Sequence, residues 1–88
     1  MHMTARPVLA RILWIDRALR SDTWPNAGSL GRELEVHART IRRDIEYLRD
    51  QLHAPIEFDP SKHGYYYSEP TYRLPFLQLT EGELVALY

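Results

Sequence analysis

The sequence predicts a mainly α-helical domain that carries one small β-hairpin, an α+β fold. Apolar residues recur at helical spacing through the first half of the chain, and a short alternating stretch followed by three tyrosines lies after residue 55. The 88 residues favour one domain with a modest core. Hydrophobic residues make up 44% and charged residues 26% of the chain, which is typical of a globular domain.

Composition limits the classes of protein that fit. No apolar run approaches the ~20 residues of a membrane span, and the N-terminus lacks the apolar core of a signal peptide. The chain has no cysteine, its four histidines lack metal-ligand spacing, and it contains neither a glycine-rich phosphate loop nor a nucleophile–base arrangement. We therefore expect a bacterial cytoplasmic protein that is not an enzyme, holds no cofactor or metal and does not associate with a membrane.

A first helix is predicted over about residues 6–20. Pro7 suits its first turn, where the missing N–H costs nothing. Residues 21–28 form a turn-rich connector, in which Pro25 biases Trp24 away from helical geometry.

A second, short helix is predicted to begin at the N-cap Ser29 and to end near Leu34 or Glu35. Leu30 and Leu34 share one of its faces. Gly31 lies in its interior, where glycine costs roughly 1 kcal/mol relative to alanine. Two explanations stay open: another helix crosses closely at Gly31, or the glycine is merely tolerated.

The third helix is predicted over about residues 38–52. Its apolar residues span an arc of only ~60° at ~100° per residue, and they are Ile41, Ile45, Leu48 and Leu52. Measured from Ile41, Arg39 lies at ~160° and Arg43 at ~200°, nearly opposite this stripe. Asp44 lies beside the stripe at ~300°, so we expect it to buttress the domain.

A β-hairpin is predicted next. Ile56-Glu57-Phe58 alternates apolar and polar residues, residues 59–64 form a turn, and Tyr65-Tyr66-Tyr67 has high strand propensity. Gly64 is expected to supply a backbone conformation that other residues resist. These tyrosines are more often sheet and core residues than platforms for single-stranded nucleic acid.

The chain divides into a domain over residues 6–69 and a linker over residues 70–88. Thr80-Glu81-Gly82-Glu83 reads as a capping box, so a helix is expected to begin after Thr80 and to include Leu84, Val85, Leu87 and Tyr88. Only about two turns of that helix fit before residue 88, and so short a helix is marginal alone. We expect the chain to be the N-terminal piece of a longer protein.

Positive charge is concentrated in the first half of the chain, although the net charge is -1. Residues 1–49 hold nine Lys/Arg and six Asp/Glu, whereas residues 50–88 hold two Lys/Arg and six Asp/Glu. A basic patch is what contact with phosphates needs, but this bias is modest.

Three helices followed by a hairpin form a winged helix-turn-helix, with the hairpin as the wing and the third helix as the recognition helix for the major groove of double-stranded DNA. Arg39 and Arg43 are the main candidate contacts, and Arg42 either contacts DNA or pairs with Glu46. Tyr47 either contacts a phosphate or packs under the wing, with packing slightly favoured. At the start of the third helix, backbone N–H groups make Ala38 and Thr40 candidates for phosphate contact. The last two candidates lie at the wing tip and are Lys62 and His63.

The stretch LEVHARTIRRDIEYL at residues 34–48 resembles the DeoR-like winged helix-turn-helix domains, in particular those at the N-terminus of bacterial WYL-domain transcriptional regulators. In that family this element often has the sequence motif L-x-V-S-x-R-T-I-x-R-D-I-x-x-L. The segments Ala54-Pro55-Ile56, Gly64-Tyr65-Tyr66-Tyr67 and Leu74-Pro75-Phe76 agree as well, so the resemblance covers nearly the whole chain. It implies a C-terminal effector domain that senses a ligand such as a nucleotide or nucleic acid, and a homodimer on paired half-sites.

One position departs from that family. Its usual serine at the start of the recognition helix is His37 here, and histidine is a poorer N-cap. The helix start is then satisfied by Thr40, water or phosphate. His37 could also touch DNA, which would make binding sensitive to pH near neutrality.

Sequence-specific DNA binding by a transcription factor domain is the first hypothesis. Two alternatives from other classes stay open. The domain could be the N-terminal regulatory winged helix of an enzyme, such as a biotin ligase that doubles as a repressor. It could also be a winged helix that binds another protein and has no role on DNA.

Overall fold

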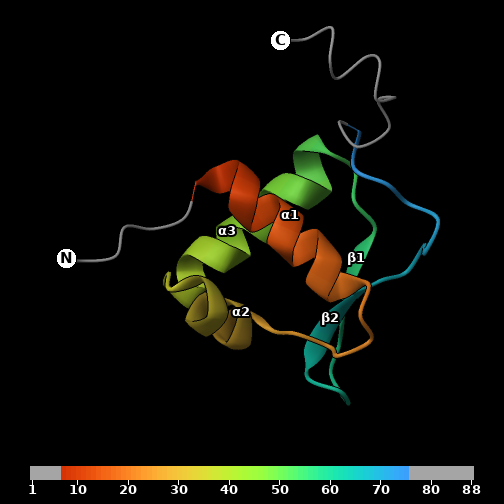
Figure 1. Cartoon of the computed structure of the whole chain (residues 1–88). Coiled ribbons are helices and arrows are strands. Elements are labelled where there is room, and N and C mark those ends of the chain that lie inside the picture. The colour runs from red at the N-terminus through yellow and green to blue at the C-terminus, as the bar shows by residue number, and fades with distance from the viewer. Residues whose placement is uncertain (1–6, 76–88) are drawn as a thin grey trace, which may run out of the picture.

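A computed structural model describes residues 7–75 of the chain, as three helices and one two-stranded antiparallel sheet (Figure 1). This is the predicted mainly helical α+β fold, a winged helix-turn-helix. Among residues 7–75, none of the helices combines the length and the apolar character of a membrane span. The elements in chain order are α1 (Val8–Leu19), α2 (Ala27–Leu34), α3 (Ala38–Gln51), β1 (Ile56–Asp59) and β2 (Gly64–Tyr67).

The core lies between α3, the two helices that pack against it, and the inner side of the hairpin. The predicted stripe of α3 is confirmed, because Ile41, Ile45 and Leu48 are buried, while Leu52 follows the helix as its C-cap. α1 is confirmed within two residues of each predicted end, with Pro7 as its N-cap. The fully buried side chains of greatest volume are Ile15, Leu30, Leu34, Ile41, Ile45, Leu48 and Leu74.

The predicted start of α2 is wrong by three residues, because Asn26 and not Ser29 is its N-cap. The Asn26 side chain accepts the Ser29 N–H at 2.8 Å, and Ser29 Oγ accepts the Asn26 N–H at 3.0 Å. This capping box satisfies two backbone donors reciprocally, and neither Ala27 nor Gly28 prevents the helix from beginning earlier. Ser29 therefore acts as the third helical residue of the box.

Gly31 is required by a close approach, the first of its two explanations. A Cβ atom there would lie 2.7 Å from the Val36 carbonyl oxygen and 3.3 Å from the Ala38 nitrogen. The neighbour is the turn and the first residue of α3, whereas that explanation names a crossing helix. Glu35 adopts a left-handed conformation (φ 60°), and the Val36 N–H donates to the Gly31 carbonyl at 2.9 Å. The helix-turn-helix angle is thus fixed by backbone contact.

The hairpin pairs Ile56 with Tyr67 at its base and Asp59 with Gly64 at its turn. The expectation that Gly64 has a special backbone conformation is wrong: the left-handed residue is His63, with φ 58°. Glycine is needed at position 64 because a Cβ would lie 1.8 Å from the Trp24 carbonyl oxygen. The turn is therefore pressed against the loop that joins α1 to α2.

A buried ion pair joins α1 to α3. Arg11 Nε donates to Asp44 Oδ2 at 2.6 Å, and Arg11 Nη2 donates to Asp44 Oδ1 at 3.1 Å. Both side chains are buried in the domain. The predicted role of Asp44 as a buttress is confirmed.

A second polar network ties α1 to the hairpin and to the chain that follows it. Asp16 accepts hydrogen bonds from Arg20 and, at 2.6 Å, from the Tyr67 hydroxyl. Burial, and then this hydrogen bond, raises the pKa of Tyr67. Arg20 also donates to the Tyr72 carbonyl at 2.6 Å, and the Tyr72 hydroxyl donates to the Leu52 carbonyl at 2.6 Å.

Residues 70–75 therefore pack on the domain, with Leu74 fully buried. The boundary at residues 69 and 70 stays a prediction. The expected helix after Thr80 lies outside the described residues.

The Arg11–Asp44 pair makes a prediction for stability. Asp44→Ala should lower the free energy of unfolding by about 3 kcal/mol, because it takes the carboxylate away from a buried guanidinium. Asp50→Ala removes an exposed carboxylate from the same helix and should change stability by less than about 0.5 kcal/mol. Chemical denaturation of both variants measures the difference, and equal effects would show that the pair does not anchor α3.

Candidate nucleic-acid interface

The outer face of α3 presents three exposed arginines, Arg39, Arg42 and Arg43. None of them forms an ion pair or a side-chain hydrogen bond within residues 7–75. The alternative in which Arg42 pairs with Glu46 is thus not adopted. The packing of α3 leaves these guanidinium groups directed away from the core, as the helical angles predict for Arg39 and Arg43.

The start of α3 has open backbone donors. His37 is its N-cap and is exposed, but its side chain makes no capping hydrogen bond. The His37 carbonyl accepts the Thr40 N–H at 2.9 Å and the Ile41 N–H at 3.3 Å. In the described part of the chain, no hydrogen bond engages the N–H groups of Ala38 and Arg39. Two donors at the positive end of the helix dipole therefore remain available to an anion.

Tyr47 and Ala38 differ in exposure. Tyr47 is 48% exposed on the outer side of α3. Its two alternatives, contact with a phosphate and packing under the wing, both stay predictions. Ala38 is partly buried, since its backbone faces Gly31.

The wing tip carries Lys62 and His63, both exposed in the turn between β1 and β2. Lys62 Nζ lies 5.0 Å from the centre of the Trp24 ring, and the His63 ring meets the Phe58 ring edge-on at 5.9 Å. Asp59 organises the turn by accepting the Ser61 and Lys62 N–H groups. The Ser61 hydroxyl also donates to Asp59, and this hydrogen bond is the main cause of the lowered pKa of the Asp59 carboxyl.

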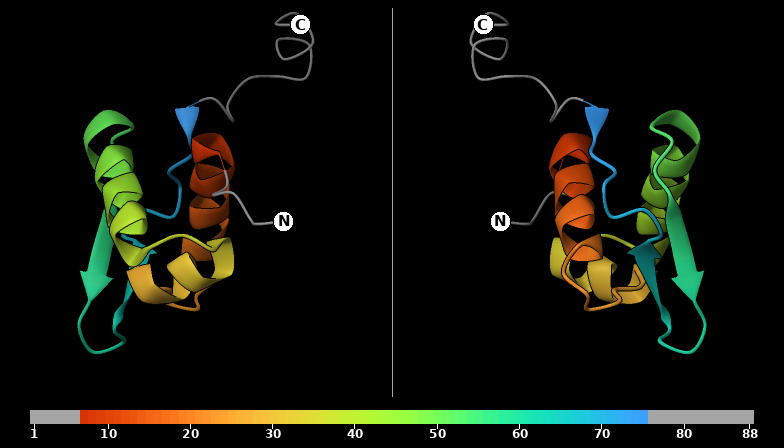
Figure 2. Two further views of the ribbon diagram at one scale, coloured as in Figure 1. Left: turned by 90° about the vertical axis from the view of Figure 1, so that its left-hand side faces the viewer. Right: turned by 90° about the vertical axis from the view of Figure 1, so that its right-hand side faces the viewer.

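The start of α3 and the wing turn lie toward one end of the molecule, together with α2 (Figure 2). The first and last described residues lie toward the opposite end. The fold therefore brings the predicted helix and wing residues to the same end, although about 20 residues separate them in the chain.

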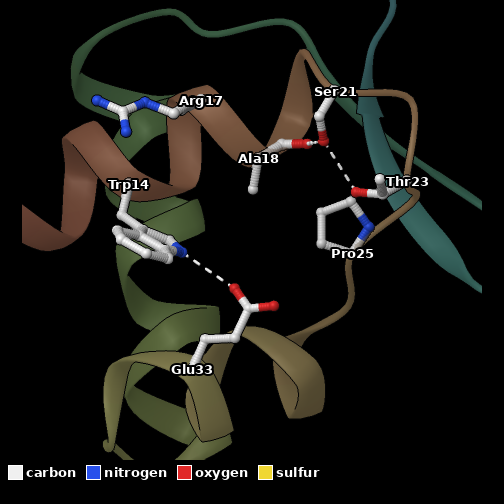
Figure 3. Close-up of a pocket in the computed structure, with 7 residues that line it drawn as sticks. All are labelled: Trp14, Arg17, Ala18, Ser21, Thr23, Pro25 and Glu33. Carbon is white, nitrogen blue, oxygen red and sulfur yellow. Dashed lines mark hydrogen bonds between the residues drawn. The ribbon is translucent and has the colours of Figure 1, made fainter.

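Side-chain bonds hold these elements in place. Arg49 Nε donates to the Ile56 carbonyl at 3.0 Å, which joins α3 to β1. Trp14 Nε1 donates to Glu33 at 3.0 Å, which joins α1 to α2 (Figure 3). Neither bond was predicted, because nothing in the spacing of these residues along the chain indicates it.

A pocket of about 230 Å³ lies beside the Trp14–Glu33 bond (Figure 3). Its polar side chains bond mainly to one another, since Ser21 pairs with Thr23 at 2.9 Å. Among residues 7–75, no three histidine or acidic side chains are placed to hold a metal ion, and no buried side-chain nitrogen or oxygen lacks a partner.

Comparison with protein families matches residues 10–66 to the family described as HTH domain. The chain belongs to the HTH domain family. The match runs from α1 to β2, so it includes the helix pair and nearly all of the hairpin. This HTH domain is therefore a DNA-binding helix-turn-helix. The comparisons with curated proteins and with solved structures found no match.

The uncapped start of α3 makes a prediction for the HTH domain. His37→Ser should raise the free energy of unfolding by about 1 kcal/mol, because a serine oxygen accepts a backbone N–H of the first turn. His37→Ala supplies no such acceptor and should match the wild type within about 0.5 kcal/mol. Thermal and denaturant melts compare the three proteins. A serine variant no more stable than the alanine variant would show that the helix start is already satisfied.

Proposed function

We propose that this HTH domain binds double-stranded DNA sequence-specifically, as the N-terminal domain of a bacterial transcriptional regulator. α3 enters the major groove, and the wing over residues 56–67 contacts the flanking backbone or the minor groove. The observation that carries this proposal is the set of exposed arginines on α3, beside a helix start with free N–H groups.

The chemistry of these groups supports the assignment. A guanidinium is a planar fork of donors that can bind guanine O6 and N7 bidentately, or two phosphate oxygens. We assign base or phosphate contacts to Arg39, Arg42 and Arg43. The Ala38 and Arg39 N–H groups suit a phosphate at the end of the helix, where the dipole favours negative charge. Of the other candidates, His37, Thr40 and Tyr47 flank this region on α3, and Lys62 and His63 occupy the wing tip.

The regulator and its partners form the finer part of the proposal. The RTIRRDI sequence of α3 supports a DeoR-like domain of the kind that precedes a WYL effector domain. Such a regulator acts as a homodimer on paired half-sites, and an effector ligand binds its C-terminal domain. The exposed arginines and the N–H donors at the start of α3 suit binding of an anion more than catalysis. A DNA partner places this activity at the bacterial nucleoid, in the cytoplasm.

Removing two arginines tests the recognition helix. Arg39→Ala combined with Arg43→Ala should weaken binding by about 1–3 kcal/mol for each arginine that reads a base, and should relax sequence preference. The probe is a duplex that the full-length protein selects from random DNA, and fluorescence anisotropy measures the affinity. The dependence of log affinity on log salt should also become less steep, by about one for each lost phosphate contact.

Arg17→Ala is the matched control, because it removes the same charge from an exposed position on α1. It should leave affinity within about twofold of the wild type, whereas Arg39→Ala alone should not. Unchanged affinity in the double variant would remove α3 as the recognition helix. A flat salt dependence of the wild type would contradict DNA binding altogether.

A further inference from the structure

The wing turn is held by three consecutive residues of the loop between α1 and α2, Trp24, Pro25 and Asn26, which we call the loop clamp. The Pro25 carbonyl accepts the Tyr65 N–H at 2.7 Å, and Asn26 Nδ2 donates to the His63 carbonyl at 3.3 Å. These two bonds hold both sides of the position occupied by Gly64. The turn is therefore attached to the helical part of the domain as well as to its own strands.

Trp24 makes the aromatic and cation–π contacts of the loop clamp. Its ring lies 5.2 Å from the Tyr66 ring, and Lys62 Nζ lies 5.0 Å from its centre. Its carbonyl fills the place that a Cβ of residue 64 would occupy. A cation over an indole face is stabilised by electrostatic attraction to the ring. Trp24 thus limits where the Lys62 ammonium can point.

The backbone conformation of Trp24 indicates that the position of this residue is imposed by its neighbours. Trp24 has φ 54°, a left-handed conformation that is unfavourable for a residue with a side chain. A bulky residue keeps such a conformation only where its neighbours over-determine it, and such residues cluster at functional sites. Here the carbonyl against Gly64 and the ring against Tyr66 are those neighbours.

Asn26 connects the clamp to the helix-turn-helix. The same side chain that caps α2 through Oδ1 holds the wing turn through Nδ2. α2 in turn sets the start of α3 through the contact at Gly31. The wing tip and the start of the recognition helix are therefore fixed to one another through a short chain of direct contacts.

We propose that Trp24 is a positioning residue for DNA binding. It holds the Lys62 ammonium where this group can contact the phosphates that flank the site read by α3. This inference rests on the proposed function and adds a residue that touches no DNA. The ligand of Lys62 is the phosphate backbone of the flanking DNA. Trp24 therefore contributes to affinity only on a duplex long enough to include these flanking phosphates.

Two substitutions separate positioning from folding. Trp24→Asn removes the ring while keeping a residue type that tolerates positive φ, and Trp24→Phe keeps an aromatic ring. With the 88-residue chain and a selected duplex that carries its flanks, Trp24→Asn should lower affinity about tenfold, the scale of one charge-assisted contact. Trp24→Phe should retain most of the wild-type affinity. On a duplex trimmed to the base pairs under α3, all three proteins should bind equally.

A double-mutant cycle gives a second readout. Lys62→Ala should lower affinity for the flanked duplex about as much as Trp24→Asn, and the two together should do no more than either alone. Arg17→Ala is the control, because it removes an exposed cation from α1 as Lys62→Ala does from the wing turn, and it should change both affinities by less than about twofold.

Equal losses on the flanked and trimmed duplexes would overturn the inference, as would additive losses in the cycle. If Trp24→Asn changes neither affinity while Arg39→Ala with Arg43→Ala abolishes binding, the positioning role fails and the proposed function stands. If the arginine variant also binds like the wild type, the proposed function itself fails, and the inference fails with it.

Discussion

The orientation of α3 depends on the buried pair between Arg11 and Asp44. Burying two charges contributes little net stability, because the attraction between them largely offsets the loss of hydration. Its consequence is geometric. Two hydrogen bonds hold Asp44 from one side, and Asp44 lies next to the apolar stripe of α3. The helix therefore keeps one rotation about its axis, in which the stripe faces inward and the arginines face solvent.

Two glycines place the remaining parts relative to that helix. At Gly31 the backbone of α2 approaches the start of α3, and at Gly64 the wing approaches the loop before α2. In both places a Cβ would meet backbone atoms, which have little freedom to move. The start of α3 and the wing tip are thus positioned by main-chain contacts, while the arginines and Lys62 supply the charge. A preorganised surface of this kind loses little conformational freedom when it binds.

Periodicity along the chain was enough to predict the three helices, the hairpin and the buried role of Asp44, because each depends on local spacing. It misplaces the start of α2, because both Asn26 and Ser29 are good caps and periodicity does not choose between them. It also misses causes that are distant in sequence: Gly64 is required by Trp24, which lies 40 positions earlier. The outward direction of Arg39 and Arg43 followed from helical angles. The loop clamp did not, because a Trp-Pro sequence indicates only a loop.

Amide chemical-shift mapping during titration with duplex DNA tests the central claim that the start of α3 and the wing turn form one DNA-binding surface. The account predicts that the largest shifts occur at Ala38 and Arg39 on α3 and at Lys62 and His63 in the wing, all at the same DNA concentration. Shifts centred on Trp14 and Ser21 beside the pocket, or no shifts at saturating DNA, would contradict it.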